Sequence, residues 1–237
     1  MNDTPILITL TNFSYKELTL NLIKSLEKLE LDIVIYCADN KTHQYFKNYN
    51  SKLIDSEIDY SNLELFRLGN WGKFVSLKFK IIKENLEENK TVIFVDGDIV
   101  FLRNPINYLK QQIGDNDILV QHDAICKTDK IECDYNYGEI CSGFMIIKSN
   151  EKTKDFFNLK NIDMNDFKCD QIYINHNINK LKFKLLSLDL FPNGYYYYSQ
   201  KKNNNNLDDI CYIIHFNCCY FHDKKKIMNH FNKFYII

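Results

Sequence analysis

The chain has 237 residues, of which 45% are hydrophobic and 26% charged, so it can bury a sizeable core and has the composition of a soluble globular protein. Its 30 basic and 31 acidic residues give a net charge of −1, which excludes a whole-protein field that would favour nucleic acid or an anionic membrane. The length suits one large α/β domain better than two small ones, so we expect a single domain over residues 1–237.

The sequence contains no sign of a membrane span or a secretion signal. No apolar run approaches the roughly 20 residues that a membrane-spanning helix needs. The apolar stretch Ile6–Leu10 is shorter than a signal-peptide core of about 7–15 residues, and no basic region precedes it. The 8 cysteines are scattered and form no Cys-x-x-Cys pair, so we expect free thiols and a cytoplasmic location.

The first elements predict a parallel strand–helix–strand unit. The continuous apolar run Ile6–Leu10 is typical of a buried strand. Ser14–Glu17 has the form of a capping box, and the leucines that follow predict a helix that ends near Leu29. Ile33–Ala38 is a second continuous apolar run. Because strands covered on both faces lack polar alternation, these two runs indicate neighbouring parallel strands.

The middle of the chain leads to the most strand-like segment. Leu63–Arg67 alternates like an exposed strand, and a helix is predicted over Lys73–Leu86. Val92–Val95 then predicts a buried strand that ends abruptly at Asp96-Gly97-Asp98. The later pattern predicts a helix start at Asn104-Pro105, strands at Asp117–Val120, Ser142–Ile147 and Cys211–Ile214, helices at Glu151–Phe157, after Asp170 and from Lys224, and a turn at Pro192–Gly194.

Four consecutive tyrosines, Tyr195–Tyr198, follow the turn at Gly194. Aromatic faces pack well on sugars, so the run could form part of a platform for a sugar acceptor. A half-buried strand is the alternative, because alternate tyrosines would then point to opposite faces of a sheet. The sequence leaves both interpretations open.

The aspartate pair Asp96 and Asp98 is the strongest candidate site. In open parallel α/β sheets, ligands bind beyond the carboxyl ends of the strands, which is where this pair lies. Two carboxylates at this edge, with Gly97 permitting a tight turn, concentrate negative charge that a hard divalent cation would offset. The alternative is a solvated turn with helix-capping aspartates, as we expect for Asp115–Asp117, which has no strand before it.

Five segments, in this order, resemble the nucleotide-diphospho-sugar transferase family, and closest are its retaining, Asp-x-Asp-containing members of GT-A type. They are Val92–Pro105, Cys141–Ile147, Cys169–Asn175, Phe191–Gly194 and Ile213–Asn217. The resemblance implies an α/β fold, Rossmann-like, with a mixed but mostly parallel central sheet and helices on both faces. It also implies a nucleotide-binding half at about residues 1–103 and a half for the acceptor and sugar at about 104–237.

The function that the resemblance implies is metal-dependent glycosyl transfer. The donor would be a nucleotide sugar, a UDP-sugar in the first place, and the acceptor a glycan, a protein or a lipid-linked molecule, with retention of configuration. Asp98 would bind the metal directly, Asp96 would bind the metal or the donor ribose, and His215 would be the third protein ligand. A set of this kind suits Mn²⁺, with Mg²⁺ as the alternative. For His215 alone, an ordinary strand-end histidine is the competing interpretation.

Basic residues are assigned to the donor by the same resemblance. Lys78 matches a position that contacts the donor phosphate or sugar, and Lys73 replaces it if the helix register is shifted. Lys224 and Lys225 lie where the family has a basic residue that neutralises the diphosphate. The sequence does not decide between these two and Lys226, because the family's glycine after the histidine is missing here.

The remaining site residues follow from the matched segments. Asp170 would lie at the reaction centre and stabilise charge on the sugar, unless it only caps a helix. Gln171 would contact donor or acceptor hydroxyls, while Ser142 and Gly143 would line the sugar pocket. The resemblance also assigns residues near the first strand to the base and ribose: Thr9, Leu10, Thr11 and Tyr15.

Two other functions remain open. The chain could be an inactive GT-A-like module that binds or scaffolds, although the presence of Asp96, Asp98, Asp170 and His215 argues against this. It could also be a metal-dependent nucleotidyltransferase, which likewise uses paired aspartates at a strand end. That class would be expected to show a Gly-rich phosphate loop or further carboxylates near the pair, and the sequence shows neither.

Overall fold

The computed structural model describes residues 4–56, 58–62, 70–126, 131–133, 140–162, 169–201, 206–218 and 221–236. The exposed strand predicted at Leu63–Arg67 lies outside these residues. The other predicted strands, at the first apolar run, at 33–38, 92–95, 117–120, 142–147 and 211–214, are all present within a few residues of the expected bounds.

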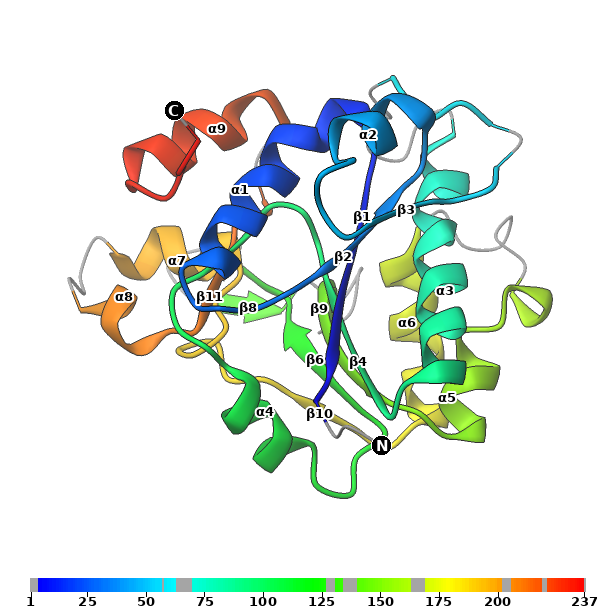
Figure 1. Ribbon diagram of the computed structural model, residues 1–237. Helices are drawn as coiled ribbons and strands as arrows, with labels where there is room; N and C mark the ends of the chain where they lie inside the picture. The colour runs from blue at the N-terminus through cyan, green and yellow to red at the C-terminus, as the bar shows by residue number, and fades with distance from the viewer. Residues whose placement is uncertain are drawn as a thin grey trace.

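The architecture is α/β and is built on a central sheet that crosses the molecule (Figure 1). Within the described residues this sheet has 7 strands in the order β10-β6-β9-β4-β1-β2-β3. Only β9 runs antiparallel to its neighbours β4 and β6, so the sheet is mixed and mostly parallel, as expected. The strands are β1 (Ile6–Thr11), β2 (Val34–Cys37), β3 (Ser51–Leu53), β4 (Thr91–Val95), β6 (Ile118–His122), β9 (Ile140–Lys148) and β10 (Phe183–Leu185).

Two small antiparallel sheets accompany the central one. β5 (Ile99–Phe101) pairs with β11 (Ile213–His215), and β7 (Ala124–Cys126) pairs with β8 (Ile131–Cys133). The first pairing matters for function, because it sets His215 opposite Ile99, the residue that follows the Asp-Gly-Asp turn. Two segments that are distant in the sequence are thereby joined at the carboxyl end of β4.

Helices cover both faces of the central sheet (Figure 1). On one face, α1 (Lys16–Glu27) and α4 (Ile106–Ile113) contribute Leu22, Leu26 and Leu109 to a buried cluster with β1 and β4. On the other face lie α3 (Trp71–Glu88), α5 (Glu151–Phe156) and α6 (Asp170–Asn177). The remaining α-helices are α2 (Asn40–Tyr45), α7 (Gly194–Lys201), α8 (Leu207–Ile210) and α9 (Phe221–His230), and short 3₁₀ turns span Phe13–Tyr15, Leu159–Asn161 and Ile178–Lys180.

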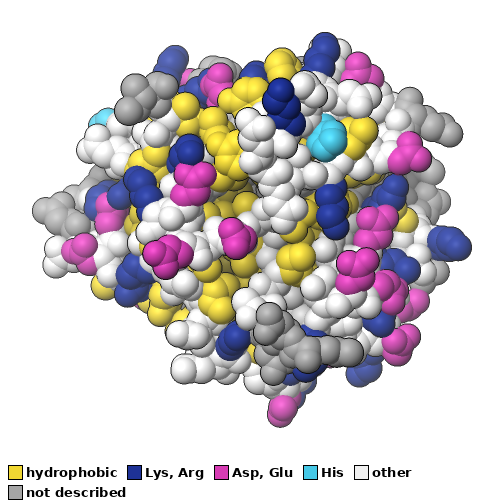
Figure 2. All heavy atoms as spheres, in the orientation of Figure 1, with side chains coloured by type: hydrophobic (Ala, Val, Ile, Leu, Met, Phe, Trp, Pro, Cys, Tyr) yellow, Lys and Arg dark blue, Asp and Glu magenta, His cyan; other side chains and the backbone are white. Residues whose placement is uncertain are grey.

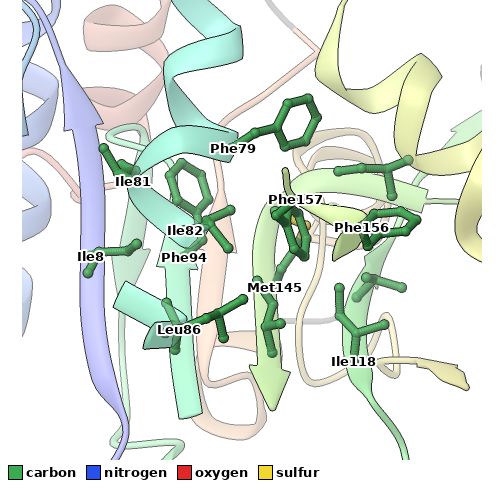
Figure 3. Close-up of a cluster of buried hydrophobic side chains, with 14 of the residues drawn as sticks. Ile8, Phe79, Ile81, Ile82, Leu86, Phe94, Ile118, Met145, Phe156 and Phe157 are labelled. Atoms are coloured by element: carbon green, nitrogen blue, oxygen red, sulfur yellow. The ribbon is translucent and has the colours of Figure 1, made fainter. Parts of the chain in front are cut away.

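The core on the α3 face is closely packed and aromatic (Figure 3). Phe79 of α3 has its ring centroid 5.8 Å from that of Phe157 and 5.3 Å from that of Tyr173. Phe94 of β4 and Met145 of β9 meet these rings from the sheet, and both are fully buried. Burying such side chains stabilises a fold by about 1.5–3 kcal/mol each, so this core holds β4 and α3 in fixed positions. Both elements position the candidate site, because α3 carries Lys78 and β4 leads directly into Asp96.

One sequence prediction is wrong in detail, and one of two open alternatives is excluded. The capping box at Ser14–Glu17 does not form, because Asn12 caps this end instead: its side-chain oxygen accepts a hydrogen bond from the backbone N–H of Tyr15. The four tyrosines form no strand. They lie in helix α7, where the Asn193 side chain accepts from the N–H of Tyr196 and so satisfies a free donor at the helix start.

The surface agrees with the near-zero net charge. Figure 2 shows basic and acidic side chains interspersed on the face seen in Figure 1, with hydrophobic atoms gathered near its middle. In the described part of the chain, no helix combines the length and the apolar character that crossing a membrane would require.

Candidate functional site

The Asp-Gly-Asp turn lies where β4 ends, at the carboxyl edge of the parallel strands. The N–H of Asp96 donates to the carbonyl of Gly143 on β9 at 2.8 Å, and the N–H of Ile99 donates to the carbonyl of Asp96 at 3.2 Å. Gly97 packs against α1, since a Cβ atom there would lie 2.7 Å from the Thr19 hydroxyl oxygen. The backbone of the turn is therefore held from both sides, by β9 and by α1.

Three predicted ligands converge at this turn. One ligand atom from each of Asp96, Asp98 and His215 lies within 4.8 Å of the other two. The Nε2 atom of His215 is 3.2 Å from Oδ1 of Asp98 and 4.0 Å from Oδ2 of Asp96. Two carboxylates and an imidazole nitrogen at these separations fit a divalent transition-metal ion such as Mn²⁺. The residues present therefore fit the metal that the resemblance implies.

Charge at the cluster is balanced by one of the candidate lysines. The Lys224 ammonium contacts Oδ2 of Asp98, and both side chains are largely buried. Burial works to raise the pKa of Asp98, but Lys224 and His215 outweigh it and hold this pKa well below its usual range. Asp96 differs, because burial raises its pKa even though Lys78 and His215 act against that shift. Of the two aspartates, Asp98 is thus the one whose surroundings favour the negatively charged form.

Gly143 gives the cluster its space. A Cβ atom at this position would lie 2.3 Å from Cε1 of His215 and 2.7 Å from Oδ2 of Asp96. Only a residue without a side chain allows both ligands to approach the β9 backbone. The resemblance assigned Gly143 to the sugar pocket, and the structure places it against the Asp96 and His215 side chains.

A second buried ion pair lies beside the first cluster. The Lys78 ammonium of α3 contacts Oδ2 of Asp170, at the start of α6, and lies 3.4 Å from Oδ1 of Asp96. The Ser142 hydroxyl donates to the same Asp170 oxygen at 2.8 Å. Burial lowers the pKa of Lys78, but the carboxylates of Asp170 and Asp96 more than offset this, so the pKa is raised. Lys73, the substitute for Lys78, is exposed.

Gln171 leads to a further carboxylate that the sequence did not reveal. Its side-chain Nε2 donates to Oδ2 of Asp123 at 2.8 Å, and Asn193 donates to the other oxygen at 3.3 Å. Burial raises the pKa of Asp123, while these two amides act against the shift. Asp123 directly follows β6, so its place after a predicted strand was the available signal.

Of the residues assigned to the base and ribose, some lie near the metal cluster and others lie inside the fold. Tyr15 is near the cluster: burial raises its pKa to about 12, and Lys224 and Asp98 both act on it. Thr9 and Thr11 are fully buried, and the Thr11 hydroxyl accepts from Thr19 at 2.8 Å. Leu10 is half-buried and packs against core residues. The two threonine side chains therefore lie inside the fold and are not brought to the metal cluster.

The two other candidate lysines are directed away from the cluster. Lys225 contacts Glu17 on α1, and Lys226 is highly exposed, 3.9 Å from Asp223. Successive residues on a helix point about 100° apart, so only one of three adjacent lysines can face the turn. Of the three, Lys224 is the one that the structure brings to Asp98.

Solved structures share this fold. The galactosyltransferase LgtC, in complex with donor and acceptor sugar analogues, superposes with a TM-score of 0.58 and 11% identity, over 98% of this chain and 96% of LgtC. The glycosyltransferase GlyE from Streptococcus pneumoniae TIGR4 gives a TM-score of 0.57 and 16% identity, over 90% of this chain and 55% of GlyE. The fold is therefore that of the GT-A glycosyltransferases.

Sequence comparison adds the family. The nucleotide-diphospho-sugar transferase profile matches residues 30–229, so the chain belongs to that family. A curated relative, the UDP-galactose:fucoside alpha-3-galactosyltransferase of Dictyostelium discoideum, is 25% identical over 93% of this chain. The chain spans 41% of that relative's length.

Proposed function

We propose that the chain is a metal-dependent glycosyltransferase that moves a sugar from a UDP-sugar donor to an acceptor hydroxyl with retention of configuration. The convergence of Asp96, Asp98 and His215 beside Lys224 is the observation that carries the proposal. A bound Mn²⁺ or Mg²⁺ would supply Lewis-acid stabilisation of the negative charge on the departing nucleoside diphosphate. The acceptor would be a glycan, a protein or a lipid-linked molecule.

The lysine beside the metal ligands has a role at the diphosphate. Lys224 places its ammonium next to Asp98, so it can also contact phosphate oxygens held at that carboxylate. An ammonium in a largely buried site stabilises the leaving group more strongly than one in water. Tyr15 lies close enough to Lys224 and Asp98 for their charges to act on its hydroxyl. It would form the wall of the nucleotide site on the α1 side.

The transferred sugar would lie next to Asp170. Its carboxylate is held by Lys78 and the Ser142 hydroxyl, so it is fixed in place before a substrate binds. A fixed carboxylate stabilises the positive charge that develops on the sugar as the bond to phosphate breaks. Gln171 is the next residue after Asp170 and bonds to Asp123. Gln171 and Asp123 would contact sugar hydroxyls of the donor or the acceptor.

Calorimetry of UDP binding tests the metal assignment. Wild-type protein should bind UDP in the presence of Mn²⁺ and much more weakly after the metal is removed. Asp98→Asn should weaken Mn²⁺-dependent binding by at least about 100-fold, because losing a direct ligand costs no less than losing an outer-shell partner. Unchanged UDP affinity in that variant would show that Asp98 holds no metal.

Turnover separates an enzyme from a binding module. UDP-galactose is the first donor to test, because the Dictyostelium relative is named for that substrate. Release of UDP that depends on Mn²⁺, with any UDP-sugar in the panel, would support glycosyl transfer. Donor binding without release of UDP from any of them would favour the inactive module.

A further inference from the structure

Gln121 has a buried amide side chain and lies outside the five segments that resemble the family. It lies near the end of β6, after the apolar residues Ile118–Val120, and is fully buried. The register between β6 and β9 shifts between Val120 and Gln121, as at a β-bulge, which redirects the side chains that follow. A buried amide is costly unless its hydrogen bonds are made, so the partners of Gln121 explain its presence.

The orientation of this amide is fixed by two backbone carbonyls. Its Nε2 group donates to the carbonyl oxygens of Phe191 and Pro192, each at 3.1 Å. Since a carbonyl oxygen only accepts, the amide nitrogen must face this side. The amide oxygen, Oε1, then faces Nδ1 of His215 at 2.8 Å.

We infer that Gln121 is a positioning residue for the metal, which acts through His215. An acceptor at Nδ1 requires the imidazole to carry a proton there, which leaves Nε2 as the nitrogen that can bind a cation. Nε2 is the atom that faces Asp96 and Asp98. The Cys141 sulfur also lies 3.5 Å from Nδ1, but sulfur is a weak acceptor. The inference rests on the proposed metal-dependent function.

The segment that orients Gln121 also holds the backbone of His215. The N–H of His215 donates to the carbonyl of Pro192 at 3.2 Å, and Asn193 forms a parallel bridge with His215. Gly194 allows this turn to pack closely against the segment that follows His215, because a Cβ atom at Gly194 would lie 2.3 Å from the carbonyl oxygen of Asn217. The turn at residues 191–194 thus fixes His215 twice, directly through its backbone and indirectly through Gln121.

Metal affinity of a Gln121→Leu variant tests the inference. Leucine has a similar volume but no acceptor, so the ring loses the partner that selects its proton position. The Mn²⁺ dissociation constant, measured by electron paramagnetic resonance of free Mn²⁺, should rise by about 10- to 100-fold. Asn85→Leu is the matched control: it removes a buried amide of α3 that bonds to Tyr36, and it should leave Mn²⁺ affinity unchanged.

Spectroscopy of the bound metal separates positioning from a general loss of stability. Electron spin-echo modulation of the wild-type Mn²⁺ complex should show nitrogen coupling from His215, which the His215→Gln variant should lack. The Gln121→Leu complex should show a weakened or missing coupling. A variant that melts at a lower temperature but keeps wild-type Mn²⁺ affinity and nitrogen coupling would overturn the inference, because Gln121 would then only support the fold.

Wild-type protein provides a test that does not depend on the variant folding. Nitrogen-15 spectra of the metal-free protein, assigned with His215→Gln, should show a proton on Nδ1 of His215. A ring that carries its proton on Nε2 alone would contradict the inference. If wild-type protein binds no Mn²⁺, the proposed function fails; if it binds Mn²⁺ and Gln121→Leu binds it equally well, only the role of Gln121 fails.

Discussion

Asp98 and Asp170 are buried to nearly the same extent, 7% and 6% exposed, yet they face different partners. The cation side of the site comprises Asp98, His215 and Lys224, so its carboxylate meets two nitrogen groups from distant segments. The transfer side comprises Lys78, Ser142 and Asp170, whose carboxylate meets one ammonium and one hydroxyl. We therefore propose that the identity of the neighbours, and not the degree of burial, distinguishes a carboxylate that binds a metal from one that faces the sugar.

Asp96 lies between the two sides. It is 3.4 Å from Lys78 of the transfer side and 4.0 Å from His215 of the cation side, and its side chain is 35% exposed. Asp96 is therefore the carboxylate that lies within reach of groups from both sides. The comparison becomes testable by removing one group from each side and measuring binding, catalysis and stability separately.

The largest effect is expected on stability, from Lys78→Met. The change leaves the buried Asp170 carboxylate without its ammonium partner, and removing one member of a buried ion pair costs about 3–5 kcal/mol. Urea denaturation followed by circular dichroism measures the change in the free energy of unfolding. Adding Asp170→Asn to the same chain should restore part of the loss, because the unpaired charge is then gone. A loss below about 1 kcal/mol would put this pair in the class of exposed ion pairs.

The next effect is on the rate of transfer, from Asp170→Asn. Asparagine keeps the shape of the side chain but not its charge, so the stabilisation of the sugar's positive charge is lost. We expect kcat to fall by about 10²- to 10³-fold, the cost of removing one preorganised electrostatic group. Mn²⁺-dependent UDP affinity, the readout of the cation side, should stay near the wild-type value. Full activity would remove Asp170 from the mechanism.

A smaller effect is expected from Gly143→Ala. The added methyl group would overlap His215 and Asp96, and overpacking of this kind costs about 1–3 kcal/mol. Because both overlapped side chains are proposed metal ligands, Mn²⁺ affinity should fall as well. Asn85→Leu is the control, since it removes a buried amide of α3 that bonds to Tyr36 and to none of the proposed ligands. Equal Mn²⁺ affinities in the two variants would show that Gly143 serves packing alone.

The cation side was largely predictable from the sequence. The apolar run Val92–Val95 ends at Asp96 and Asp98 without a break, so the strand itself delivers the two carboxylates to the edge of the sheet. His215 was found through a resembling segment, and the structure brings it to the pair because β11 bonds to β5. Local pattern was sufficient for the aspartate pair, because it follows a strand, whereas His215 needed the resemblance as well.

Other parts of the site and the fold depend on contacts between distant segments, which local sequence patterns do not encode. Gln121 reaches His215 across 94 positions of sequence, through a change of register that the sequence does not signal. The choice of Lys224 over Lys225 depends on where α9 begins and which way it is turned. The tyrosine run became a helix because Asn193 caps it and Tyr197 is buried among other rings, which outweighs the strand preference of tyrosine.

The central claim is that Asp96, Asp98 and His215 together hold a divalent cation that binds the diphosphate of a nucleotide sugar. The most direct measurement is anomalous diffraction at the manganese edge, from a crystal of this protein grown with Mn²⁺ and UDP. We expect a single strong peak between the two carboxylates and the imidazole, in contact with the phosphate oxygens of UDP. A peak at another place, with Asp96 and Asp98 turned towards solvent and away from the nucleotide, would contradict the claim.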